Sequence, residues 1–362
     1  MHKPLLHVLV LLFFFLPSSS AHAQKGGPAW GPDTTTGKLD WIRLNSGEWL
    51  GGELLALYDD VLEFDSDKLD YRSFDWDDVI EVRTAQVMEI WLLGGISARG
   101  KLVIEGKRVL VQGGEKELQF ERADLVTIAA GDAGESNKWT AKATLGGSVR
   151  RGNTDQTEYN FKAEVRRRTI RSRLDFDLLS NYSTNNDVNT VDNHRFNATW
   201  DHFMTDRLFL RPVFAEYYSD PFQNIAHRGT LGTGVGYTIA RTPKTNWDVI
   251  SGPGVQRTWF ETVEADEDEA VTTPALVVGT TLEMELTDWM DFDYNYNLTV
   301  TNDESGKYNH HTVISFDTEL TSRLDFTVSF VWDRIAKPRP EETGEVPDKD
   351  DFRMSVGLTF DF

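Results

Sequence analysis

From residue 139 to the C-terminus, the sequence alternates between apolar and polar residues in segment after segment. The final stretch, DDFRMSVGLTFDF, carries an apolar side chain at every second position from Phe352 and ends on Phe362. A period of two is that of a β-strand, because successive side chains point to opposite faces of a sheet. One such strand could cover the core of a soluble sandwich or face lipid, so the number of strands and their connections must decide.

Twelve strand-like segments follow one another in this region, at residues 139–149, 156–168, 172–183, 193–203, 208–220, 228–240, 245–260, 271–286, 289–302, 307–320, 323–335 and 351–362. Each is long enough to cross a bilayer, which takes ~9–11 tilted residues. Segment 245–260 contains Ser251-Gly252-Pro253-Gly254. We expect a bulge or kink there, because Gly and Pro weaken the interior of a strand.

The connections between these segments alternate in length. Turns as short as Thr169-Ile170-Arg171 and residues 241–244 alternate with mostly longer polar loops, such as 261–270 and 336–350. Short turns at one end and longer loops at the other are typical of outer-membrane barrels, and an even strand number returns both chain ends to the short-turn side. We therefore predict a twelve-stranded antiparallel transmembrane β-barrel over residues 139–362, with both of its ends in the periplasm.

Aromatic residues gather at both ends of the predicted strands. At the short-turn ends these are Trp139, Phe203, Tyr237, Trp247, Trp289, Phe360 and Phe362, and at the long-loop ends Tyr159, Tyr182, Tyr217, Trp259 and Trp332. Two aromatic belts are expected at the two surfaces of a membrane. Because a soluble barrel of twelve strands could not fill its interior, we expect the apolar face to meet lipid and the polar face to line a lumen.

The N-terminus has the features of an export signal. A basic start is followed by an apolar run from Leu5 to Leu16 and by Ala21-His22-Ala23, which predicts a signal peptide over residues 1–23. The run is too short to span a membrane comfortably. Residues 24–37, rich in Gly, Pro and Thr, are expected to form a flexible linker. The chain has no Cys for disulfides or lipid attachment, and its net charge of −21 argues against nucleic acid as a partner.

Residues 38–131 form a second β-rich region, a small periplasmic domain whose sequence looks duplicated. Residues 41–44 and 52–54 are echoed by 89–92 and 100–102, and residues 76–82 by 122–128. Short strands with turn signals favour a tandem pair of small SH3-like or Sm-like barrels, with coincidental β-rich sequence as the alternative. A second linker is expected over residues 132–138.

Acidic residues crowd the first of these two copies. They are Asp59, Asp60, Glu63, Asp65, Asp67 and Asp70. Their spacing fits no EF-hand loop, so a solvated acidic face is favoured over a metal site.

Four stretches of the barrel region resemble a known family. Gly152-Asn153-Thr154-Asp155, residues 205–209, residues 232–237 and Gly252-Pro253-Gly254 resemble, in their order and spacing, the motifs of domain of unknown function 481, a family described as salt-induced outer-membrane proteins. The resemblance covers about residues 139–362 and implies the outer membrane of a Gram-negative bacterium, with little indication of activity. The terminal Phe362 is similar to the aromatic residue that such barrels present to the barrel assembly machinery, so we expect it to be an assembly signal.

The polar face of the predicted barrel carries charged residues that we expect to line the lumen. These candidates are Lys162, Glu164, Arg166, Arg168, Arg173, Asp175, Asp177, Asp291, Asp293, Asp317, Glu319, Asp325 and Asp361. We expect Arg166, Arg168 and Arg173 to converge near the periplasmic mouth, with an acidic wall on strands nine to twelve. Opposed charges across a narrow passage could sort solutes. The same charges could instead pair into a network that plugs and rigidifies the barrel.

Three functions therefore stay open. One is a narrow, porin-like channel for small polar solutes, and another is a structural or interaction barrel with a plugged lumen, linked to salt or osmotic stress. The third and weakest is an outer-membrane hydrolase. The sequence contains no G-x-S-x-G, H-E-x-x-H or phosphate-loop motif, so we expect neither an enzyme nor a cofactor.

The expected partners follow from this topology. They are outer-membrane lipid, the barrel assembly machinery and an envelope protein that binds residues 38–131. Four histidines near the loop ends of strands are weak candidates for a metal site: His194, His227, His310 and His311.

Overall fold

The computed structural model describes residues 37–362, apart from residues 114–115, 132–134, 151–154, 288 and 322. The predicted signal peptide, nearly all of the first linker and part of the second therefore lie outside the described residues, as do Gly152, Asn153 and Thr154. Thr34–Phe362 form one compact unit. Within it, the described strands form a small sheet and a closed barrel.

Ten strands form the small sheet. They are β1 (Asp40–Leu44), β2 (Trp49–Tyr58), β3 (Val61–Ser66), β4 (Asp70–Asp75), β5 (Val79–Arg83), β6 (Met88–Leu92), β7 (Ser97–Glu105), β8 (Arg108–Gly113), β9 (Lys116–Glu121) and β10 (Leu125–Ala130). β1 pairs with β2 and β5, and β6 pairs in the same way with β7 and β10. β2-β3-β4 and β7-β8-β9 are equivalent antiparallel meanders. The duplication in the sequence thus reappears in the strand pairing, while the likeness of each half to an SH3-like or Sm-like barrel stays a prediction.

The small sheet encloses an apolar core. Alternate residues of its strands point inward, and Ile42 and Phe64 are completely buried there. Asp40 is a polar exception whose carboxylate accepts hydrogen bonds from the backbone N–H groups of Leu54 at 2.8 Å and Ala85 at 2.7 Å. A buried carboxylate is tolerated when its oxygens are paired in this way.

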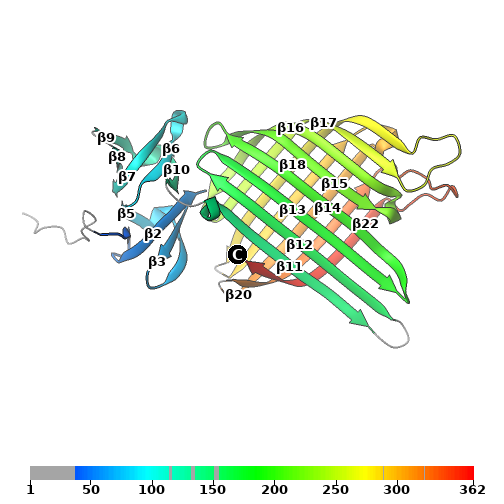
Figure 1. Cartoon of the computed structure of the whole chain (residues 1–362), viewed down its shortest axis with the longest axis horizontal. Helices are drawn as coiled ribbons and strands as arrows, with labels where there is room; N and C mark the ends of the chain where they lie inside the picture. Colours follow the sequence, from blue (N-terminus) through cyan, green and yellow to red (C-terminus); the bar gives the residue numbers. More distant parts are fainter. Residues whose placement is uncertain (1–36, 114–115, 132–134, 151–154, 288, 322) are drawn as a thin grey trace, which may run out of the picture. The chain divides into compact units, whose positions relative to one another are not determined.

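Twelve strands close the barrel in sequence order (Figure 1). They are β11 (Trp139–Arg150), β12 (Gln156–Thr169), β13 (Ser172–Asn185), β14 (Val188–Phe203), β15 (Leu208–Asp220), β16 (Ile225–Thr242), β17 (Thr245–Phe260), β18 (Ala270–Thr287), β19 (Met290–Val300), β20 (Tyr308–Thr321), β21 (Leu324–Ile335) and β22 (Asp350–Asp361). All neighbours are antiparallel, and β11 pairs with β22 to complete the ring. The predicted all-β fold with a closed twelve-stranded barrel is confirmed, whereas its placement in a membrane remains a prediction.

The register of the barrel separates a polar inner face from an apolar outer face. Asp201 and Thr258, on the inner face, are completely buried, whereas Leu231 and Val255, on the outer face, are exposed. The barrel therefore has the reverse of the usual arrangement in which apolar side chains fill the interior. No helix among the described residues is long and apolar enough to span a membrane.

The expected bulge at Ser251-Gly252-Pro253-Gly254 is not found. Strand β17 keeps a single register with β18 throughout, and Ser251 lies opposite Val278 in it. Gly252 makes this possible because it lies against β16: a Cβ there would be only 1.8 Å from the carbonyl oxygen of Thr233. The glycines therefore allow close approach of two strands rather than a kink.

One expected member of the aromatic belts lies inside instead. Phe203 is buried and its ring packs 5.7 Å from that of Phe209. Alternation along β14 places Phe203 on the same inner face as Arg195 and Asp201, which are also buried. Other predicted belt residues, such as Trp289 and Tyr159, remain exposed.

Candidate functional site: the lumen of the barrel

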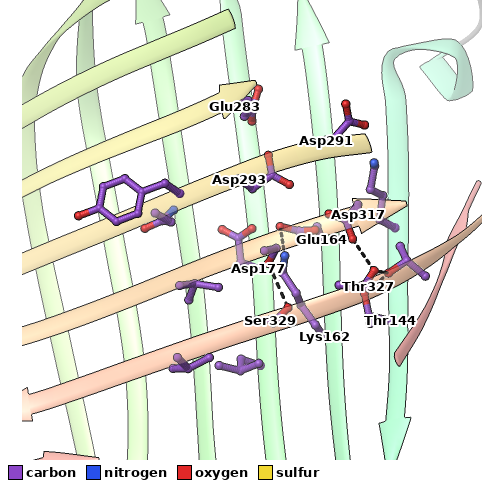
Figure 2. A pocket seen from close by; sticks show the side chains of 18 of the residues that line it. Thr144, Lys162, Glu164, Asp177, Glu283, Asp291, Asp293, Asp317, Thr327 and Ser329 are labelled. Atoms are coloured by element: carbon purple, nitrogen blue, oxygen red, sulfur yellow. Dashed lines mark hydrogen bonds and ion pairs between the residues drawn. The ribbon is translucent and has the colours of Figure 1, made fainter. Parts of the chain in front are cut away.

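The barrel contains a lumenal chamber with a volume of about 540 Å³. Figure 2 shows Lys162, Glu164 and Asp177, from β12 and β13, grouped with Asp293 and Asp317, from β19 and β20. The predicted lumen residues that line this chamber are Lys162, Glu164, Arg166, Asp175, Asp177, Asp291, Asp293 and Asp317. This volume and mixed polar lining are within the range of sites that hold small molecules.

Each basic residue of the chamber wall has a carboxylate partner. Lys162 pairs with Glu164 at 2.9 Å, and Arg166 pairs with Asp175 at 2.7 Å and Glu283 at 3.1 Å. The other pairs are Lys142 with Asp361, Lys244 with Glu285, Arg195 with Glu216 and Asp333, and Arg353 with Asp333 and Asp351. The positive charges of the wall are thus neutralised locally.

Several carboxylates of the same wall lack such a partner. Asp177, Asp291 and Asp293 make no ion pair with any described residue, and Asp317 accepts a hydrogen bond only from the neutral hydroxyl of Thr327. Because the wall's cations are already paired, these groups leave the chamber with an excess of negative charge. A cation in the chamber would meet an attractive field.

A buried ion-pair network lies in the lumen at its short-turn end. Arg173 contacts Asp201 at 2.9 Å and Asp248 at 2.8 Å, and Arg211 contacts Asp201 at 2.6 Å. Arg173 is 6% exposed and Asp201 is 0% exposed. The ring of Phe209 lies 5.8 Å from the Arg173 guanidinium. We call Arg173, Asp201, Arg211 and Asp248 the short-turn network.

Arg168 has a different partner from the other two predicted arginines. Both of its terminal nitrogens donate to the carboxylate of Asp59, which also pairs with Arg241 at 3.3 Å. Burial alone would raise the pKa of Asp59, but Arg168 and Arg241 outweigh it and hold the pKa below its usual range. The ring of Tyr58 lies 4.7 Å from the Arg168 guanidinium, and burial raises the pKa of Tyr58 to about 12.

A second buried network lies at the long-loop end of the lumen. Arg195 bridges Glu216 at 2.5 Å and Asp333 at 2.9 Å, while Arg353 contacts Asp333 at 2.6 Å and His311 contacts it at 2.7 Å. We call this set the long-loop network. Of its members only His311 was among the sequence candidates, although the inward position of the others on alternating strands was an available signal.

The remaining candidates are distributed along both faces. Glu319, Asp325 and Asp361 lie on the inner face by register, at the short-turn end and outside the chamber. The four histidines do not converge, because His311 faces inward whereas His194, His227 and His310 hydrogen-bond to neighbours on the outer face. Within the described part of the chain, no group of three or more His, Asp or Glu residues could hold a metal ion.

The geometry defines the class of this molecule: a closed, twelve-stranded β-barrel with a charged lumen, joined to a small β-sheet domain. Residues 143–362 match the family model described as protein of unknown function, DUF481. The chain belongs to this family, as the four motifs in the sequence indicated. A comparison with curated proteins finds no match.

Solved structures of other barrels share low similarity with the chain. The NanC porin has a TM-score of 0.37 and 10% identity, with 61% of this chain and 98% of that chain covered. The translocator domain of the autotransporter NalP from Neisseria meningitidis has a TM-score of 0.33 and 12% identity, covering 62% and 87% of the two chains. The outer membrane channel DcaP of Acinetobacter baumannii has a TM-score of 0.28 and 10% identity, covering 90% and 94%. Similarities of this size transfer no activity, so the function must be inferred from this chain's own residues.

Proposed function

We propose that this protein is an outer-membrane β-barrel that forms a narrow passage for small polar solutes and prefers cations. Its residues 38–131 and its short turns would lie in the periplasm. An outer face of exposed apolar residues and an inner face of buried polar ones support placement in lipid, because a soluble barrel would expose the polar face. The connection between β17 and β18 and the one between β21 and β22 are long, whereas β18 and β19 are joined by a short turn.

The topology can be tested on intact cells. A protease site inserted in loop 261–270 or 336–350 is expected to be cut from outside, while one inserted in the turn that joins β18 to β19 is expected to be protected. Cleavage at the turn with protection of both long loops would reverse the proposed orientation.

The charge of the chamber carries the proposed solute preference. Asp177, Asp291 and Asp293 lack basic partners, whereas every basic residue of the wall is paired. In a passage of low dielectric constant, uncompensated carboxylates attract cations and repel anions. The arginines of the wall do not offset this attraction, since they are held in ion pairs.

The preference can be measured in planar bilayers with the purified, refolded protein. Asp177→Asn/Asp293→Asn should lower the ratio of cation to anion permeability, read from the reversal potential in a salt gradient. Asp187→Asn is the matched control, because Asp187 lies in an exposed turn with a positive φ that Asn also adopts. An unchanged ratio in the double variant would contradict the cation preference.

A second function is favoured by the two buried networks. They place paired, buried side chains in the lumen at both ends, which fits a structural or interaction barrel with a closed lumen whose small domain binds an envelope partner. A stable wild-type protein that conducts at no voltage would decide for this function. Conductance that the folded wild-type protein shows, and that is lost when the barrel is unfolded, would decide for the passage.

A further inference from the structure

Arg228 is a buried guanidinium that lacks a partner. It lies on the inner face of β16 and is 5% exposed. It makes no hydrogen bond or ion pair with any described residue, and its Nε is buried without an acceptor. The ring of Tyr218, with its centroid 5.7 Å away, offers only a weak cation–π contact.

The carboxylates at this end of the lumen are already engaged. Glu216 and Asp333 are bound by Arg195 and Arg353 in the long-loop network. The nearby buried Asp220 accepts hydrogen bonds from the Tyr218 hydroxyl at 2.8 Å and from the backbone N–H of Phe222 at 3.1 Å. Arg228 therefore adds a positive charge that no described carboxylate contacts.

A cavity of about 20 Å³ adjoins this guanidinium. Arg228, Gln256 and Thr299 line it, together with Arg195 and the two carboxylates that Arg195 holds, Glu216 and Asp333. The hydroxyl of Thr230, the next inward residue of β16, is buried and also lacks a partner. The cavity is large enough for one particle of about the size of a water molecule.

We propose that this cavity binds a single monatomic anion, chloride, held by Arg228. A water molecule could occupy the same volume, but it would leave the guanidinium without a counter-charge, and a buried unpaired charge is strongly destabilising. A monatomic anion supplies that charge. Sulfate, phosphate and carboxylate ligands are too large for the cavity.

The bound chloride acts as a structural counterion beside the long-loop network. It links β16 to the residues of β15 and β17 that surround Arg228, so the folded barrel is more stable where chloride is present. This inference concerns the folded interior and does not depend on whether the barrel conducts or on which solute it passes.

The first test compares thermal unfolding of the full-length protein in sodium chloride and in sodium gluconate of equal ionic strength. Gluconate is too large to enter, so the wild-type melting temperature should be ~2–4 °C higher in chloride. Arg228→Gln should abolish this difference. Arg257→Gln is the control and should retain it, because Arg257 lies on the neighbouring strand, opposite Gly229, and is exposed on the outer face. Equal melting temperatures of the wild-type protein in the two salts would overturn the proposal.

The second test does not depend on whether Arg228→Gln folds. Crystals of the wild-type protein grown in sodium bromide should show one anomalous peak beside the Arg228 guanidinium. Ordinary water density there without anomalous signal would overturn the proposal. A peak that persists in Arg228→Gln would also overturn it, since the anion would then be held by other groups.

Discussion

The small sheet and the barrel are built from the same kind of alternating strand, yet they bury opposite sets of side chains. In β7, Leu102 and Ile104 are completely buried within an apolar core. In the barrel, Asp201 and Thr258 are completely buried, while Leu231 is 56% exposed. Alternation therefore predicts a strand without saying which face will be inside.

The difference between the two regions lies in what stabilises each interior. An apolar core gains stability from each side chain removed from water, largely independently of its exact partner. A charged interior gains stability only where every charge meets its counter-charge, and a single missing partner is costly. We therefore expect the two regions to respond differently to the same kind of substitution.

The largest effect is expected where the short-turn network loses its central carboxylate. Asp201→Ala leaves the guanidiniums of Arg173 and Arg211 without the partner that joins them. We expect the free energy of unfolding, measured by urea titration in lipid vesicles, to fall by ~3–5 kcal/mol. Asp206→Ala, in the turn between β14 and β15, removes only a long surface ion pair with Arg207 at 3.7 Å and should cost less than ~0.5 kcal/mol. Equal stability of the two variants would show that the barrel interior does not depend on complete pairing.

The strands that carry the ion pairs of the lumen could be predicted from the sequence, but the pairing of charged residues across the lumen could not. Each strand alternates between inward and outward residues, and this alternation placed Arg166 and Asp175 on the inner face. The two residues lie opposite each other on neighbouring strands. Arg195 and Asp333 are 138 residues apart, and alternation does not indicate that two inward residues on distant strands lie at the same height. The period of two along β14 also places Phe203 on the inner face, but the register shift between β14 and β15 beside its contact with Phe209 is revealed by no local pattern.

The strand pairs that join the two halves of the small sheet escaped prediction for a similar reason. The repeat predicted two equivalent halves, and the strand pairing within each half agrees with it. The pairs β5–β7 and β10–β2 join one half to the other, however, and depend on long-range contacts between strands that have similar local sequences. The alternation within each strand does not determine which of these similar strands becomes its partner.

A cavity in the small sheet should cost nearly as much as a broken ion pair in the barrel. Leu102→Ala removes a completely buried side chain from the apolar core, and we expect a loss of ~2–5 kcal/mol. Leu231→Ala makes the same chemical change on the exposed outer face of the barrel and should cost far less in detergent. Hydrogen exchange, which reports on the two regions separately, can measure both. A comparable loss at both positions would contradict the opposite burial of the two regions.

A smaller effect is expected at Asp59, whose side chain is 22% exposed. Asp59→Asn removes the charge that Arg168 and Arg241 share. We expect a loss of ~1–2 kcal/mol at neutral pH, because hydrogen bonds to charged groups contribute modestly when they are partly hydrated. Asp60→Asn is the matched control: both residues have a positive φ that Asn tolerates, and no ion pair is found for Asp60 among the described residues.

The pH dependence of this effect has a definite sign. The pKa of Asp59 is lower in the folded protein than its usual value. Its contribution is therefore fully present above the unfolded pKa of about 4 and is lost as the pH falls through the folded pKa. The stability difference between wild type and Asp59→Asn should stay constant from neutral pH to about pH 4 and shrink below it. A difference that grows on acidification would show that Asp59 is not held by the two arginines.

The smallest effect on stability, but not on assembly, is expected at the last residue. Phe362 is 80% exposed, and only its backbone is bound, through two hydrogen bonds with Ala141. Phe362→Ser keeps those bonds and removes little packing, so the melting temperature of the refolded barrel should change by less than ~2 °C. If the aromatic ring is a signal read during assembly, the amount of barrel inserted in outer membranes should nevertheless drop sharply, while Phe360→Ser, which keeps the terminal Phe, should be inserted more efficiently. Equal outer-membrane levels of Phe362→Ser and wild type, measured by quantitative immunoblotting, would leave the terminal aromatic as an ordinary part of the apolar outer face.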